Sequence, residues 1–285
     1  MSTRSIALAP GTWGELVQGV VDGNHALVTC PVNLHACAVA SAGQPGRWQG
    51  PSGRPRTQAA LDDIPGGGRV SIRSPLRPGA GMASSTADLC AAMAAASALA
   101  GLTLTPEQLF TRCLQQEPTD GLMFPGIALV DHVRGSRVEL LGPPPPLGIV
   151  GVDPGGVVQT AGFNSRADLI DANRRKEPAV REALAIARGA VAAGDGAALA
   201  AAATLSARAH QAILPNPLWE RAEKLAPVCG ALGINVAHSG TVIGFLFDLN
   251  RTDLAEAAHW LRQRLGLPVR VLKLIGGGVS VNTRR

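Results

Sequence analysis

The sequence predicts an α+β protein made of two subdomains. Its 285 residues exceed what one compact core usually holds, and 46% of them are hydrophobic against 16% charged, as in globular chains. Four prolines in GPPPPL, at residues 142–147, interrupt the pattern, and proline fits neither helix interiors nor inner strands. We therefore expect one subdomain over residues 1–145 and a second over residues 146–285.

The first half of the chain predicts several strands, then two helices, then two further strands. Short apolar or alternating segments predict strands, and longer alanine-rich segments predict helices. The expected strands cover 5–9, 15–20, 25–40, 69–74, 126–133 and 137–141, and the expected helices cover 86–100 and 105–116. Residues 43–58 are polar and rich in Gly and Pro, which predicts an irregular connection.

The second half predicts a different order of elements. A strand at 147–153 precedes a helical tract over 166–232, with breaks expected at Pro178, at 194–196 and at Pro215. The elements expected after it are strands at 233–238 and 241–248, a helix at 252–265, and strands at 269–275 and 278–283. In this order a strand is followed by helices, two strands, a helix and a further strand. This is the split βαβ order of a ferredoxin-like unit.

Charge and cysteine usage exclude several classes of function. The net charge is +5, but the basic residues are spread along the chain, and the densest run is only 174–176. Without a basic stripe or interleaved aromatic residues, we expect no nucleic-acid partner. Five scattered cysteines without a CxxC pair argue against a disulfide framework and against a zinc site.

No segment of the sequence predicts a membrane or secretory role. The apolar runs fall short of the roughly 18 to 20 residues that a membrane span needs. The apolar stretch near the N-terminus ends at Pro10 and is too short for a secretory signal. We expect a cytoplasmic protein without a membrane partner, and the sequence leaves the oligomeric state open.

The segment RPGAGMASSTADL, residues 77–89, is a glycine-rich loop in front of a helix. Glycines allow successive N–H groups to point inward, and a helix N-terminus adds partial positive charge, so the loop predicts an anion site. Ser84 and Ser85 offer hydroxyls to phosphate or Mg²⁺. The alternative is an ordinary capping box in which Ser85 caps the helix and Asp88 reaches back. No lysine lies near the loop, which excludes a Walker A motif.

Three segments resemble the GHMP kinases, the family of galactokinase and of homoserine, mevalonate and phosphomevalonate kinases. PGAGMASSTA resembles their PGAGLGSSAA loop, while residues 7–19 and 236–248 resemble their N-terminal and C-terminal motifs, in family order. The resemblance implies the GHMP kinase fold, with an N-terminal ribosomal S5 domain 2-like subdomain and a C-terminal ferredoxin-like subdomain. PGTWGELVQG, EPTD and AHSGTVIG most resemble the members that phosphorylate L-threonine for the cobalamin side chain.

The resemblance also implies an ATP site with Mg²⁺. The residues expected around the triphosphate are Pro78, Gly79, Ala80, Gly81, Met82, Ala83, Ser84, Ser85 and Thr86. Ser85 would help to hold Mg²⁺ and so take part in catalysis, and Glu117 would share the metal. Asp120, in the segment EPTDG, is the candidate base for the acceptor hydroxyl. The alternative interpretation of EPTDG is a polar turn that ends a helix.

The acceptor site is expected between the two subdomains. Thr12 stands where mevalonate kinase-like members carry lysine, and Gln18 stands where they carry glutamate. Glu15 would pair with an ammonium group, and Gln18 would bond a hydroxyl or a carboxylate, although both also fit exposed strand positions. The residues expected to bind the acceptor are Thr12, Glu15, Gln18, Asp120, Ser239 and Gly240.

The function that the sequence predicts is transfer of phosphate from ATP to the hydroxyl of a small amino acid. L-threonine is the expected substrate, and O-phospho-L-threonine for cobalamin side-chain synthesis is the expected product. One alternative is a kinase for another acceptor such as homoserine. The other is a GHMP-fold sensor or regulator without kinase activity, since the family lysine is missing at Thr12.

Overall fold

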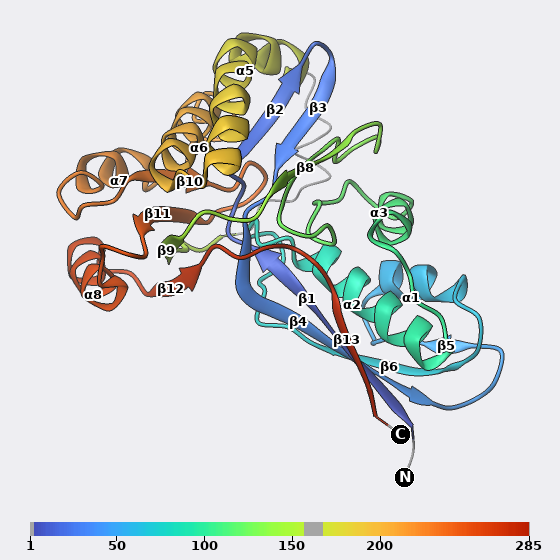
Figure 1. Cartoon of the computed structure of the whole chain (residues 1–285). Coiled ribbons are helices and arrows are strands. Elements are labelled where there is room, and N and C mark those ends of the chain that lie inside the picture. Colours follow the sequence, from blue (N-terminus) through green and yellow to red (C-terminus); the bar gives the residue numbers. More distant parts are fainter. Residues whose placement is uncertain (1–2, 157–167, 285) are drawn as a thin grey trace.

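The computed structural model describes residues 3–156 and 168–284, and its first layer is a five-stranded sheet (Figure 1). The strand order is β13-β1-β4-β6-β5, antiparallel except for the pair β5 and β6. The strands are β1 (Arg4–Thr12), β4 (Pro31–Ala42), β5 (Trp48–Gln49), β6 (Gly68–Arg73) and β13 (Ser280–Arg284). In β4 the last residues alternate between buried and less buried, as expected of a sheet with one face on the core.

Helix α2 (Ser84–Leu99) packs against β1 and β4 and forms the centre of the N-terminal core. Every residue from Thr86 to Ser97 is buried, and half of these residues are alanine. Neighbouring elements therefore approach the helix on all sides. Two further helices, α1 (Pro55–Asp62) and α3 (Pro106–Leu114), cover it. The helices expected at 86–100 and 105–116 are confirmed.

A second antiparallel sheet has the order β2-β3-β7-β8. Its strands are β2 (Val17–Val21), β3 (Asn24–Val28), β7 (Ile127–Val130) and β8 (Val138–Gly142). The helices α5 (Leu169–Ala193) and α6 (Gly196–His210) pack on β2, which lies far from them in the sequence. A Cβ added at Gly19 would lie 2.6 Å from Val180, so β2 and α5 approach closely.

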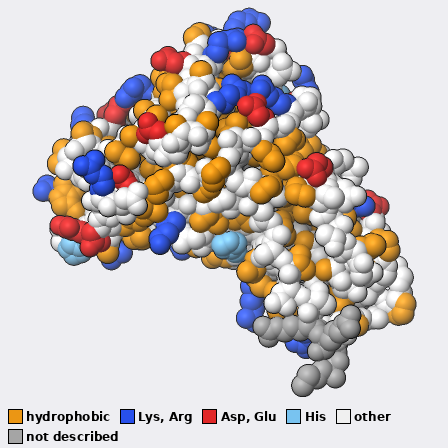
Figure 2. All heavy atoms as spheres, viewed as in Figure 1, with side chains coloured by type: hydrophobic (Ala, Val, Ile, Leu, Met, Phe, Trp, Pro, Cys, Tyr) orange, Lys and Arg blue, Asp and Glu red, His pale blue; other side chains and the backbone are white. Residues whose placement is uncertain are grey.

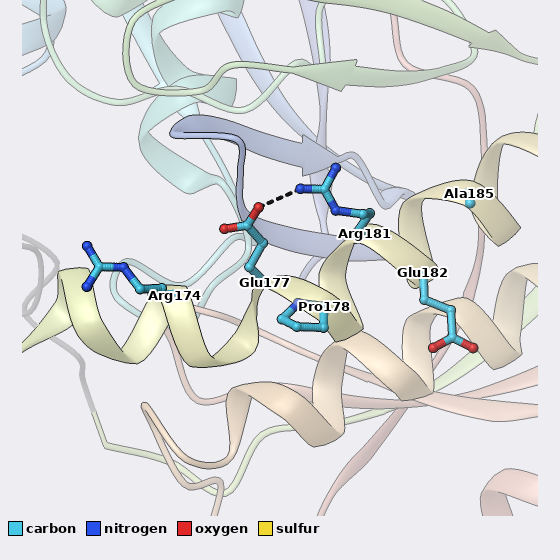
Figure 3. Close-up of a pocket in the computed structure, with 6 residues that line it drawn as sticks. All are labelled: Arg174, Glu177, Pro178, Arg181, Glu182 and Ala185. Atoms are coloured by element: carbon cyan, nitrogen blue, oxygen red, sulfur yellow. Dashed lines mark hydrogen bonds and ion pairs between the residues drawn. The ribbon is translucent and has the colours of Figure 1, made fainter.

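The break expected at Pro178 is wrong, because α5 continues through it. An interior proline costs a helix about 3 kcal/mol. The buried residues Ala172, Val180 and Ala183 keep helical spacing on both sides and hold both halves of α5 against the protein. Pro178 itself is exposed and lies beside the ion pair of Glu177 and Arg181 (Figure 3). The first residues of the predicted helical tract, 166–167, lie outside the described residues.

The third sheet has the order β10-β11-β9-β12, entirely antiparallel. Its strands are β9 (Leu147–Val152), β10 (Gly233–Val236), β11 (Ile243–Asp248) and β12 (Val269–Lys273). Helices α7 (Trp219–Leu225) and α8 (Leu254–Leu265) share a hydrophobic cluster with it. This strand order, with helices after the first and third strands, is the ferredoxin-like arrangement that the sequence predicts.

Two segments differ from the sequence prediction. Residues 43–58 include β5 and the start of α1, and Trp48 is buried, with its indole N–H directed at the carbonyl oxygen of Ile64 at 3.2 Å. The last strand, β13, pairs with β1 rather than with the third sheet (Figure 1). The subdomain boundary near residue 145 stays a prediction.

The charged side chains of the described residues are dispersed over the surface, and the cysteines are unpaired. On the face in Figure 2, basic side chains are spread among acidic ones, with a mixed group over α5 at the top of the view. All five cysteines are free thiols. None of the helices described is long and apolar enough to span a membrane.

Candidate active site

The glycine loop, residues 77–83, connects β6 to α2 through three left-handed residues. Gly79 and Gly81 have φ angles of 70° and 84°, and Ala83 has a φ of 49°. Ala83 is the residue before the first turn of α2, and no side chain caps that turn. Among the residues that the structure describes, the first N–H groups of α2 therefore have no side-chain acceptor, which is the arrangement found at anion sites.

The capping-box alternative for this loop is wrong. The helix already begins at Ser84, so Ser85 is its second residue and lies inside the first turn. Asp88 does not reach back to the helix start but forms an ion pair with Arg54, just before α1. The left-handed turn at Ala83 starts the helix earlier than a serine cap would, so the half-buried Ser84 and Ser85 are the first two residues of the helix.

The N-terminal motif holds one side of the glycine loop. Gly14 N–H donates to the carbonyl oxygen of Gly81 at 2.9 Å, and Thr12 N–H donates to that of Met82 at 3.1 Å. Gly14 has a φ of 62°, and a Cβ there would lie 2.6 Å from the backbone of Val236, so only glycine fits. Thr12 is buried, and its Oγ1 has no hydrogen-bond partner in the described part of the chain.

The C-terminal motif holds the other side of the loop. The N–H groups of Thr241 and Val242 donate to the carbonyl oxygen of Ala80 at 2.9 Å and 3.0 Å. Gly240 presses on the same peptide, since a Cβ there would lie 2.3 Å from the carbonyl carbon of Ala80. Ser239 precedes it and is half-buried. The three motifs that lie far apart in the sequence therefore meet around one loop.

Arg77, at the start of the loop, is bound by Asp153 at the end of β9. Its guanidinium donates to both carboxylate oxygens of Asp153, at 2.7 Å and 2.6 Å, and to Oγ1 of Thr241 at 2.8 Å. Thr241 also donates to Asp153 at 2.8 Å. This bidentate pair fixes the loop to the third sheet.

Asp120 lies beside the first turn of α2. The preceding residue, Thr119, is buried, and its hydroxyl lies 2.9 Å from that of Thr86 in α2. Oδ1 of Asp120 is buried and has no hydrogen-bond partner among the described residues. Burial, and then the charge of Glu117, raise the pKa of Asp120 to about 6, so the carboxylate is mostly ionised at pH 7. An unpartnered carboxylate oxygen next to a helix N-terminus fits a hydroxyl donor there.

The carboxylate of Glu117 forms an ion pair with a basic side chain. Its carboxylate accepts a hydrogen bond at 2.5 Å from Arg56 of α1. In residues 3–156 and 168–284, no group of three His, Cys, Asp or Glu is arranged to hold a metal. Mg²⁺ commonly binds through one or two protein oxygens plus substrate phosphates, and the half-buried hydroxyl of Ser85 is an oxygen of that kind. The metal roles of Ser85 and Glu117 stay predictions.

Glu15 is buried and faces His238 in the C-terminal motif. Its Oε2 accepts hydrogen bonds from the backbone N–H of His238 at 2.8 Å and from Nδ1 of its ring at 3.0 Å. Burial, and then the charge of Asp120, raise the pKa of Glu15 to about 8. Burial also holds the pKa of His238 well below its ordinary value, so the ring is neutral. Glu15 thus positions His238, and its contact with a substrate ammonium stays a prediction.

A cavity of about 740 Å³ opens beside this cluster. It lies between the β2–β3 hairpin, the turn after β7, and the facing ends of α5 and α6. The polar residues that line it include Gln18, His25, His132, Lys176, His210 and His238. Gln18, predicted to bind the acceptor, donates from Nε2 to Nε2 of His132 at 3.2 Å. Pro118, two residues before Asp120, also lines the cavity.

Lys176 and His210 are cavity residues that the sequence interpretation did not include. Lys176 is one of only three lysines and lies in the basic run 174–176. The available signal was its spacing on α5, four residues before the buried Val180 and four after the buried Ala172. That spacing puts Lys176 on the inward face of the helix, where a lysine is unusual.

Comparisons with known proteins agree with this geometry. The model of the GHMP kinases N terminal domain matches residues 55–124, which contain the glycine loop, α2 and Asp120. L-threonine kinase of Salmonella typhimurium is 31% identical over 97% of this chain and 95% of that protein. L-threonine kinase of Citrobacter freundii is 30% identical over 97% of this chain and 99% of that protein.

Solved structures share the fold at low identity. Homoserine kinase from Cytophaga hutchinsonii superposes with a TM-score of 0.73 at 16% identity, covering 98% of this chain and 97% of its own. A mevalonate kinase gives a TM-score of 0.70 at 12% identity, covering 96% and 99%. The GHMP kinase fold predicted from the sequence is confirmed. With relatives of this identity along almost its whole length, the chain belongs to the GHMP kinase family.

Proposed function

We propose that the protein is an ATP-dependent kinase that converts L-threonine to O-phospho-L-threonine. The observation that carries the proposal is the 31% identity to an L-threonine kinase over 97% of the chain. The geometry supports it, because a glycine loop, an uncapped helix N-terminus and the turn that carries an unpartnered carboxylate lie together. Pro118, in the segment before that carboxylate, lines the cavity. We further propose that the product serves cobalamin side-chain synthesis and that the enzyme works in the cytoplasm.

In this proposal the glycine loop and the first turn of α2 bind the triphosphate of ATP. The N–H groups that follow Ala83 stabilise the charge that builds up on the transferred phosphoryl group. Mg²⁺, held through Ser85 and with Glu117 as a second candidate, supplies further charge neutralisation when bound. The rigid contacts of Gly14 and Thr241 with the loop keep these donors in place before ATP arrives.

Asp120 accepts the proton of the threonine hydroxyl as its oxygen attacks the γ-phosphorus. A P–O bond forms to the threonine oxygen, the bond between the γ-phosphorus and the bridging oxygen breaks, and ADP leaves. Asp120 suits this step because its Oδ1 has no hydrogen-bond partner within the described ranges and its pKa of about 6 leaves it mostly ionised at pH 7.

An acceptor panel tests the proposal. ADP release is measured with L-threonine, L-serine, L-homoserine and mevalonate, and the product is identified by phosphorus NMR. L-threonine is expected to exceed L-serine by about 10- to 200-fold, the value of one methyl group, and mevalonate to be far worse. Faster turnover of homoserine or mevalonate would overturn the choice of acceptor. Tight ligand binding without ADP release would favour a sensor.

A further inference from the structure

Lys176 is a buried lysine on the wall of the cavity. Only 5% of its surface is exposed, whereas Lys224 and Lys273 are exposed. It projects from the first half of α5, on the side opposite the exposed Pro178, and lines the cavity together with Gln18. Burying an ammonium group is unfavourable unless other groups compensate its charge, so its surroundings indicate what it is placed to bind.

The contact between Lys176 and His210 has a defined direction. Nζ lies 3.3 Å from Nδ1 of His210, and Nε2 of the same ring lies 2.9 Å from the carbonyl oxygen of His238. A carbonyl only accepts, so Nε2 carries the proton, and the pKa of His210, held well below its ordinary value by burial, keeps the ring neutral. Nδ1 is therefore an acceptor, and Lys176 donates to it.

The described residues accept only some of the hydrogen bonds that the Lys176 ammonium group can donate. An ammonium group has three N–H donors, and in the part of the chain that the structure describes the contact with His210 uses one of them. No carboxylate in the described ranges forms an ion pair with Lys176. Glu15 acts on it only through longer-range attraction, which opposes the lowering of the Lys176 pKa to about 7 by burial. An anion bound beside Nζ would favour the charged form of Lys176, so this wall of the cavity is complementary to an anion.

Gln18, on β2, offers the opposite polarity in the same cavity. Its Nε2 is used by His132, while its Oε1 is buried and has no hydrogen-bond partner among the described residues. A carbonyl oxygen of this kind accepts from a cationic donor. The cavity thus presents the incompletely satisfied donor of Lys176 and the unpartnered acceptor of Gln18, beside the buried Nδ1 of His132, which also has no partner among the described residues. A zwitterionic amino acid carries a carboxylate and an ammonium that match Lys176 and Gln18.

We propose that Lys176 binds the α-carboxylate of the amino-acid acceptor and that Gln18 accepts a hydrogen bond from its α-ammonium. A nucleotide phosphate is the other anion in the reaction, but none of the loop residues 77–86 lines this cavity. The inference rests on the proposed function, and it assigns to Lys176 the selection of amino acids over hydroxyl compounds without a carboxylate.

The test compares L-threonine with L-threoninamide, in which a neutral amide replaces the carboxylate. In the wild type, kcat/KM is expected to fall about 10- to 100-fold for the amide, the scale of a lost charged hydrogen bond. Lys176→Met is expected to lose a similar factor with L-threonine but less than about threefold with the amide, and KM for ATP is expected to stay unchanged. Lys224→Met, at an exposed lysine of α7, is the matched control.

The outcomes separate this inference from the proposed function. Equal losses with both substrates in Lys176→Met, or a raised KM for ATP, would assign Lys176 to the phosphoryl transfer and overturn the inference. Equal use of both substrates by the wild type would overturn it without any variant, so the test does not depend on the folding of Lys176→Met. If the wild type prefers homoserine, the proposed acceptor fails, and the same comparison with L-homoserine amide still tests Lys176.

Discussion

The hydroxyl groups of Thr86 and Thr119 lie 2.9 Å apart inside the protein, and they join the first turn of α2 to the turn that carries Asp120. Both side chains are buried, so their hydrogen bond is protected from competing water. The helix that follows the glycine loop and the candidate base are therefore positioned by one contact.

Asp120→Asn is expected to lower kcat by about 100-fold or more, because an amide does not accept the proton of the acceptor hydroxyl. The fold is expected to persist, since the change removes a buried charge whose Oδ1 has no partner in residues 3–156 and 168–284. Steady-state kinetics and a thermal melt measure the two effects. Asp63→Asn, at an exposed position after α1, is the control. Near-normal turnover in Asp120→Asn would remove Asp120 from the mechanism.

The activity is expected to decrease as the pH falls through about 6. Asp120 works as a base only when ionised, and burial raises its pKa to about 6. Glu15, with a pKa of about 8, is already protonated at that pH and does not change charge. Glu117→Gln removes a negative neighbour, so the pKa of Asp120 falls and the acid limb of kcat/KM shifts to lower pH. An unshifted limb would mean that another group controls it.

Ala83→Gly is expected to stabilise the protein by roughly 0.5 to 1 kcal/mol. Ala83 has a φ of 49°, where its Cβ is strained and glycine is not. Chemical denaturation measures the change in the free energy of unfolding. Ala185→Gly, at an exposed position within α5, should instead destabilise by about 0.5 to 1 kcal/mol. Destabilisation at both positions would argue that the side chain of Ala83 makes contacts that outweigh its strain.

Asp153→Asn is expected to raise KM for ATP by about tenfold and to change KM for the acceptor less. Asp153 binds Arg77 through both carboxylate oxygens and also accepts from Thr241, so its charge fixes the glycine loop. Loss of a charged hydrogen bond is worth about 1.5 to 3 kcal/mol. Glu223→Gln removes the exposed ion pair with Arg208 and is the control. An unchanged KM for ATP would show that the loop keeps its shape without this pair.

The sequence predicted the parts of the site that depend on local chemistry. Small residues fit the loop because its backbone is left-handed in places and closely packed. Gly81 has a left-handed φ, and a Cβ at Gly81 or at Gly240 would lie too close to neighbouring atoms. Residue types alone therefore marked the loop, whereas the C-terminal motif was identified by its resemblance to the GHMP kinases. Whether Asp120 and Glu15 act as proposed is still a prediction, although the charge of Asp120 contributes to the raised pKa of Glu15.

The parts that depend on tertiary packing were not predicted. Lys176 reaches the cavity because α5 passes through Pro178 and packs on β2, and local rules predict a break there. Trp48 lies in a Gly- and Pro-rich segment, yet the backbone around it is held by Gln58, which bonds Gly50 N–H and the carbonyl oxygen of Trp48. Such long-range or side-chain contacts leave little trace in composition or periodicity.

The pairing of β13 with β1 has a consequence for how the protein is made. Ser5 and Thr283 are partners in this ladder, so the edge of the five-stranded sheet stays open until almost 280 further residues have been translated. Until then β1 has only β4 as a neighbour in this sheet, and an open strand edge is a template for association with other chains. We expect chaperone dependence during synthesis to exceed that of refolding from dilute denaturant, where both strands are present from the start.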